Sequence, residues 1–189
     1  PATTMLLAGV AVGAFATAVT TFLMLRRPDG LQRAFNWMLG GYSTGGWRPV
    51  QIMLPYLLLG AITLQICARA LNVFQLGEEQ AQQLGVNVEV MKMLLVAAAT
   101  LMTAAAVAFG GLIGFVGLIV PHALRMLCGP DHRRLLPYSM LGGAAFLVLC
   151  DLLARTLLAP QEIPVGVITA LTGTPFFIFL LRKLKSSVL

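Results

Sequence analysis

Long apolar runs separated by short charged or glycine-rich stretches follow one another along this chain. Several approach the ~20 residues that a helix rising ~1.5 Å per residue needs to cross a ~30 Å hydrocarbon core. Lipid offers no partner to an unpaired backbone group, so spanning segments of this kind are helical. We therefore predict an all-α integral membrane protein, a single domain over residues 1–189. The six expected transmembrane helices are residues 5–25, 50–68, 90–109, 113–127, 135–158 and 164–181.

The longest polar segment, residues 72–92, lies between the second and third of these spans and reads NVFQLGEEQAQQLGVNVEVMK. Glutamate and glutamine favour a short helix there, and Gly77 and Gly85 supply stops at its two ends. The apolar positions of that helix would form a narrow stripe of Ala81, Leu84 and Val88. The pattern fits either a solvated linker between two spans or a helix that docks on another protein.

A second segment between spans, residues 31–39, is too short to cross a bilayer. It opposes Arg33 to aromatic and methionine side chains, so we expect it to lie at the membrane interface. The glycine-rich stretch at residues 40–46 reads as a flexible link to the following span.

The composition supports a membrane location, because 58 % of the residues are hydrophobic and only 11 % are charged, against roughly a quarter charged in soluble domains. The net charge of +6 does not indicate nucleic acid, because the basic residues come in ones and twos at the ends of apolar runs. The side that holds the polar segment carries Arg69, Lys92, Arg125, Arg133, Arg134, Arg182, Lys183 and Lys185. The other side carries Arg26, Arg27, Arg33 and Arg48. By the positive-inside rule the polar segment is expected in the cytoplasm.

Cysteine and histidine give no sign of a metal site. The cysteines at positions 67, 128 and 150 are far apart in sequence and lie in or beside apolar runs, which favours packing thiols. His122 follows Pro121 in an apolar segment, and we expect its imidazole to satisfy a carbonyl that the proline frees, or a neighbouring helix. No GxxxxGK[ST] motif occurs, so nucleotide hydrolysis by this chain itself is not expected.

Two opposite charges, Asp151 and Arg155, lie four residues apart inside the fifth predicted span. They share a helix face and can neutralise each other, and charges at membrane depth are functional candidates. One interpretation is a structural pair that fixes helix packing. The other is a functional role, since Arg155 lies close enough to the helix end to reach the surface.

A set of motifs in one order resembles a known family, the membrane permeases of ABC importers for cobalamin, iron-siderophores and haem. The densest stretch is GFVGLIVPH at residues 114–122, followed by Arg125, Gly129, Asp131-His132-Arg133 and Leu136-Pro137. Further matches are LLAG at 6–9, Trp37 with Gly40, LGE at 76–78, Ala81, Leu84-Gly85, Asp151, Ala154-Arg155, PVGV at 164–167 and PFF at 175–177.

The resemblance implies a ten-helix permease fold of the type II importers, of which this chain corresponds to helices five to ten. The chain begins at Pro1 beside a predicted span, without a signal peptide, and is expected to be the C-terminal portion of a longer protein. Residues 72–89 then correspond to the cytoplasmic element that couples the permease to its ATPase. Its recognisable positions are Gly77, Glu78, Glu79, Ala81 and Gly85.

The resemblance also suggests roles at the outer end and along the substrate route. Arg155 matches a position that docks the periplasmic binding protein, and Asp151 is its structural partner. The first span, the interfacial segment and the last span would line the route, where Thr3 and Trp37 are candidate pathway residues. No metal or cofactor is expected on this chain, and ATP would be used by a partner subunit.

We therefore expect a permease subunit that imports a metal chelate across the cytoplasmic membrane of a bacterium, with no catalytic activity of its own. Its expected partners are a second permease copy or a paralogue, a cytoplasmic ATPase dimer, a periplasmic or lipoprotein binding protein, and membrane lipid, but no nucleic acid. The alternatives are an ion-coupled secondary transporter that uses Asp151 as its protonatable group, and a non-functional or structural fragment.

Overall fold

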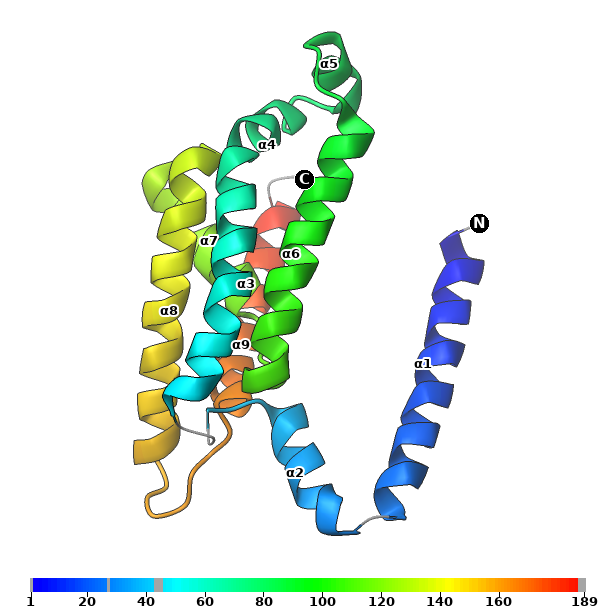
Figure 1. Ribbon diagram of the computed structural model, residues 1–189, viewed down its shortest axis with the longest axis vertical. Coiled ribbons are helices and arrows are strands. Elements are labelled where there is room, and N and C mark those ends of the chain that lie inside the picture. Colours follow the sequence, from blue (N-terminus) through cyan, green and yellow to red (C-terminus); the bar gives the residue numbers. More distant parts are fainter. Residues whose placement is uncertain (1, 27, 43–45, 187–189) are drawn as a thin grey trace. The chain divides into compact units, whose positions relative to one another are not determined.

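The computed structural model describes residues 2–26, 28–42 and 46–186, without the side chains at 2–3, 28–29, 32–33 and 181–186. This described part of the chain contains nine helices and no strand, which confirms the predicted all-α class there (Figure 1). The chain divides into two compact units, Pro1–Met38 and Leu39–Leu189.

The first unit consists of α1 (Ala2–Leu25) and most of α2 (Pro28–Leu39). In α1, Thr17, Thr20 and Thr21 each donate a hydrogen bond of 2.8 Å to the carbonyl four residues earlier. These bonds satisfy hydroxyl groups that would otherwise be costly to place in lipid. The helix α2 begins with a proline, which suits a first helical turn, and separates its polar and apolar residues onto different faces.

Seven helices lie wholly within the second unit (Figure 1). They are α3 (Trp47–Ile66), α4 (Ala68–Phe74), α5 (Glu78–Gln83), α6 (Val88–Gly110), α7 (Val116–Cys128), α8 (His132–Thr156) and α9 (Val165–Ser186). The pairs α3/α6, α7/α8 and α8/α9 pack side by side, while α4 and α5 lie at one end of the bundle.

Small residues allow the close helix pairs to form. Gly60 of α3 faces Met102 of α6 with no room for a Cβ between them, and Gly142 of α8 would place a Cβ 2.9 Å from the side chain of Leu124 on α7. Such contacts replace the hydrophobic effect as the source of helix association in lipid. The buried core of the unit lies where α8 meets the start of α9 and comprises Cys150, Ala154, Val165 and Ile168.

Three distant segments meet through their backbones at the other end of this unit. The N–H of Gly41 donates to the carbonyl of Gly110 at 2.9 Å, and the N–H of Gly166 donates to the carbonyl of Gly40 at 3.4 Å. A Cβ on Gly40, whose φ is +66°, would lie against the carbonyl oxygen of Leu112. The prediction of a flexible glycine link is therefore wrong at Gly40, where close backbone packing requires glycine, and at Gly41, whose backbone is held by its hydrogen bond. Residues 43–45 lie outside the described part.

All six predicted spans begin at other residues in the structure, and two of these differences have a clear local cause. The expected helix from residue 113 begins only at Val116, because Phe115 adopts a left-handed conformation with φ 68°. The expected helix from residue 135 begins at His132, because the Asp131 side chain caps it by accepting a hydrogen bond from the N–H of Arg133 at 3.0 Å. Pro137 lies inside this helix and cannot donate to the Arg133 carbonyl, which instead accepts a bond of 3.0 Å from the side chain of Gln65.

Four described helices are long and apolar enough to cross a membrane: Thr4–Leu25 of α1, and α3, α6 and α8. The other two predicted spans are shorter. The 13 residues of α7 cover about 20 Å at ~1.5 Å per residue, and the apolar part of α9 is Val165–Leu180.

Candidate functional site

The predicted polar helix exists as α5 and is held between two glycines in conformations that L side chains rarely adopt. Gly77 has φ 109° and Gly85 has φ 82°. Glu78 and Glu79 occupy the first turn, where carboxylates are favoured by the helix dipole. Ala81 is fully buried, and its carbonyl accepts a hydrogen bond of 3.1 Å from the N–H of Val86. The glycine stops predicted from the sequence are confirmed.

The predicted apolar stripe on this helix is only partly correct. Ala81 and Val88 are buried, but Leu84 is 64 % exposed. The helix ends at Gln83, so Leu84 is its C-cap and no longer follows helical spacing. An exposed leucine at the tip of α5 leaves an apolar side chain available beside the two glutamates.

An ion pair connects α5 to α6. Nζ of Lys92 on α6 lies 2.6 Å from Oε1 of Glu78, although both side chains are about half exposed or more, so the pair contributes little stability. Among the described residues Glu79 has no such partner. The two adjacent glutamates therefore differ, since one is paired internally and the other faces outward.

A hydrogen-bonded cluster joins α4 to the turn between α7 and α8, and the sequence reasoning missed it. Nδ2 of Asn72 donates to Oδ1 of Asp131 at 2.6 Å, and Oδ1 of Asn72 accepts from the backbone N–H of His132 at 2.8 Å. Nε2 of Gln75 donates to the carbonyl of Pro130 at 3.1 Å and lies 2.8 Å from Nδ1 of His132. The available signal was the spacing of Asn72 and Gln75, which places two amides on one helix face.

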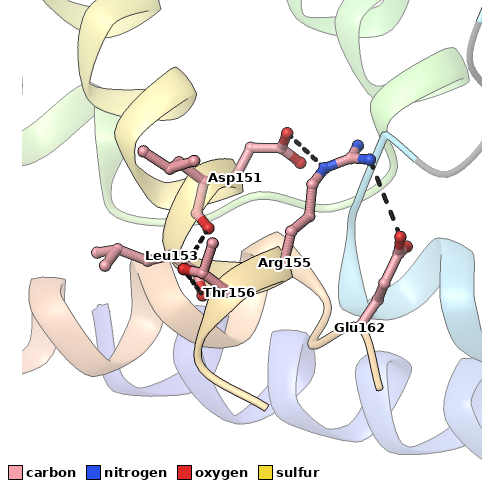
Figure 2. A network of polar contacts seen from close by, with 6 residues as sticks. Asp151, Leu153, Arg155, Thr156 and Glu162 are labelled. Atoms are coloured by element: carbon pink, nitrogen blue, oxygen red, sulfur yellow. Dashed lines mark hydrogen bonds and ion pairs between the residues drawn. The ribbon is translucent and has the colours of Figure 1, made fainter. Parts of the chain in front are cut away.

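At the far end of α8, Arg155 forms the predicted pair with Asp151, and Glu162 is a second partner (Figure 2). Nε of Arg155 lies 2.8 Å from Oδ2 of Asp151, and Nη1 lies 3.9 Å from Oε1 of Glu162. The Arg155 side chain is 47 % exposed. Arg155 is in the last turn of α8, and the C-terminal end of α8 lies at the opposite end of the unit from α5 (Figure 1).

Asp151 also lines a cavity of about 1020 Å³ between α3, α6 and α8. Among the described residues its walls are mainly apolar, with Tyr42 and Ser139 as the other polar side chains. Burial, and secondly the negative charge of Asp151, raise the pKa of the Tyr42 phenol above its usual value of 10.0. The phenol therefore stays protonated at neutral pH and can donate a hydrogen bond.

His122 on α7 lies against the ring of Phe176 on α9 in an edge-to-face arrangement, with the ring centres 6.1 Å apart. The imidazole thus meets a neighbouring helix through a ring contact, while the carbonyl bond suggested for it is not found among the described residues. Cys67 and Cys150 are buried and Cys128 is half-buried, which agrees with packing thiols.

The two candidate pathway residues lie in the first unit. Trp37 is on α2 and 46 % exposed, and Thr3 is on α1, with its side chain outside the described part. Their proposed role along a substrate route stays a prediction.

These features together define a multi-pass helical membrane protein with a short acidic helix at one end and an exposed ion pair at the other. The model of the FecCD transport family matches residues 1–183, and the chain belongs to this family.

Individual relatives agree with this assignment. The chain is 50 % identical over 182 residues to the cobalamin import system permease protein BtuC of Halobacterium salinarum, covering 96 % of this chain and 49 % of that protein. It is 43 % identical to the hemin transport system permease protein HmuU of Yersinia pestis, with 95 % and 54 % covered. The chain thus spans about half the length of these curated relatives.

A solved structure supports the fold. A chain described as "an inward-facing conformation of a putative metal-chelate type ABC transporter" is 34 % identical and superimposes with a TM-score of 0.83, covering 93 % of this chain and 59 % of that chain.

Proposed function

We propose that this chain is the C-terminal part of the permease subunit of an ABC importer that moves a metal chelate, such as an iron-siderophore, haem or cobalamin, across the cytoplasmic membrane. The observation that carries the proposal is the family membership over residues 1–183. In this proposal α1, α3, α6, α7, α8 and α9 are six of the ten membrane helices of a type II importer permease. The subunit itself performs no catalysis, and ATP is hydrolysed by a partner.

The geometry supports placing α5 at the ATPase. A short helix fixed by glycines at both ends and by the buried Ala81 can transmit a push as a rigid body. It presents Glu79 and the exposed Leu84 to a partner. The basic residues Arg69, Lys92, Arg125, Arg133 and Arg134 lie on helix segments at the same end of the bundle, which favours a cytoplasmic location for α5.

Arg155 is proposed to dock the substrate-binding protein at the outer surface. Its side chain is half exposed and its guanidinium is held by Asp151, and the planar donors suit bidentate recognition of a carboxylate on that partner. The transporter would contain two permease copies or paralogues, an ATPase dimer and a binding protein.

The test is to express the full-length permease with its ATPase and binding protein, reconstitute them in vesicles, and measure uptake of radiolabelled cobalamin, haem and ferric siderophores. We expect uptake of one of these chelates that requires ATP and the binding protein. Uptake driven by a proton gradient without ATP, and abolished by Asp151→Asn, would instead indicate a secondary transporter. Failure of the ATPase to co-purify with the permease would overturn the proposal.

A further inference from the structure

The cluster between α4 and α8 contains more polar contacts than the local chain requires. Asp131 caps α8 through the N–H of Arg133, so that function is complete within the turn itself. Its Oδ1 nevertheless also accepts from Asn72 at 2.6 Å, and the same Asn72 side chain accepts from the N–H of His132. The Asn72 side chain therefore binds both a side-chain acceptor and a backbone donor at the start of α8.

Besides these bonds, the helix α4 is held by packing of its buried Ala68 and Ala70. It has only seven residues, too few for independent stability in water, and it follows α3 after a bend at Cys67. It leads to α5 through Gln75 and Gly77, where φ reaches 109°. The position of the start of α5 therefore depends on the contacts that hold α4. Among the described helices, α4 packs against α3, α5 and α8.

The bonds from Asn72 are accompanied by two others that reach the same end of α8. Gln75 donates to the carbonyl of Pro130, and Gln65 at the end of α3 donates to the Arg133 carbonyl left free by Pro137. All three amides lie on residues 65–75, the segment from the end of α3 through α4 that we call the α3–α4 arm. All their partners lie within residues 130–133. A side-chain clamp thus joins the α3–α4 arm to the first turn of α8.

We propose that Asn72 is a positioning residue that delivers the displacement of α5 to α8, a proposal that rests on the permease function given above. Because α8 is continuous from His132 to Thr156, a shift at its first turn reaches Asp151 and Arg155, about 30 Å away at ~1.5 Å per residue. The clamp therefore connects the ATPase side of the protein with the end that carries the exposed arginine.

The test exploits the reciprocal geometry of Asn72 and Asp131. In Asn72→Asp two carboxylates face each other where a bond of 2.6 Å now lies, and the donor is lost. In the double variant Asn72→Asp with Asp131→Asn the donor and acceptor exchange places, while asparagine still caps α8. The control is Gln51→Glu, the same amide-to-carboxylate change at an exposed position of α3.

Each variant is assayed as the full transporter in vesicles, with uptake per ATP hydrolysed as the readout. Loss of a hydrogen bond to a charged group corresponds to roughly a tenfold effect, so we expect Asn72→Asp to lower that ratio roughly tenfold with ATP hydrolysis retained. The double variant should recover most of the ratio, and the control should match wild type. A wild-type ratio in Asn72→Asp, or no recovery in the double variant, would overturn the proposal.

A second measurement separates coupling from folding. Spin labels at Gln82 of α5 and Arg134 of α8, both exposed, are introduced after replacement of the native cysteines by alanine. With Asn72 in place, we expect one narrow distribution of the distance between the two labels. In Asn72→Ala we expect a broad distribution and unchanged thermal stability. An unchanged distribution in Asn72→Ala would contradict the clamp. If wild-type vesicles show no ATP-driven uptake, the permease function fails instead, while the spin-label result still decides the clamp.

Discussion

Nε of Arg155 lies 2.8 Å from Oδ2 of Asp151, one helical turn earlier on α8. The aspartate orients the guanidinium, while 47 % of the arginine side chain remains accessible. We predict that Arg155→Ala weakens docking of the binding protein, with a larger loss at low salt than at high salt, because an exposed rim charge acts mainly on the association rate. The measurement is a binding titration of the cognate binding protein against full-length transporter at two salt concentrations.

The alternative for this pair is a purely structural role, and the same experiment distinguishes it. Asp151→Asn keeps the arginine but removes its charged partner, so it should retain part of the affinity. Unchanged affinity of Arg155→Ala at low salt, together with a lower melting temperature, would assign Asp151 and Arg155 to helix packing alone.

A second prediction concerns Glu79, which is exposed and has no ion-pair partner among the described residues. Glu79→Arg should uncouple ATP hydrolysis from uptake without changing thermal stability, because the reversed charge lies on an exposed helix outside the bundle. Glu79→Gln keeps the shape and removes only the charge, so it should have a smaller effect. Wild-type ATPase recruitment and uptake in Glu79→Arg would remove this residue from the coupling site.

Gly173 on α9 gives a packing prediction. A Cβ there would collide with the Cβ and ring of Phe115, and the backbone of Phe115 is already in the left-handed region. Overpacking of this kind costs ~1–3 kcal/mol, so Gly173→Ala should lower the melting temperature. The control is Gly143→Ala on α8, where a Cβ would meet Val116 at an ordinary 3.9 Å and stability should be retained. Equal melting temperatures for the two variants would contradict the packing described here.

A fourth prediction concerns His122 and its ring contact with Phe176. His122→Gln should retain most transport, since no reacting group is removed, but lose an edge-to-face contact worth ~0.5–1.5 kcal/mol. His122→Phe should keep the contact and the thermal stability. Added divalent metal should leave the melting temperature of wild type unchanged; a metal-dependent shift that disappears in His122→Gln would instead identify a ligand.

The elements that the sequence predicted well are those with a strong local signal. Apolar runs of membrane length predicted the long helices, Gly77 and Gly85 predicted the ends of α5, and the four-residue spacing of Asp151 and Arg155 predicted their pairing. Each of these depends only on neighbours within a few turns of the same segment.

The features that escaped prediction depend on residues far apart in sequence. Asn72 and Asp131 are separated by 59 residues, and neither side chain marks its partner locally. From the sequence we interpreted Gly40 as part of a flexible linker, because glycine occurs both in loose chain segments and at tight backbone crossings. Only the position of Leu112 beside it distinguishes the two cases.

The backbone crossing at Gly40, Gly110 and Gly166 has a mechanical consequence. Hydrogen bonds and close contacts between main chains cannot lengthen through a change of rotamer. The crossing therefore holds its three segments firmly at this end of the residue 39–189 unit. When a partner displaces α5, the motion should be smallest at the crossing and largest at the tip of α5.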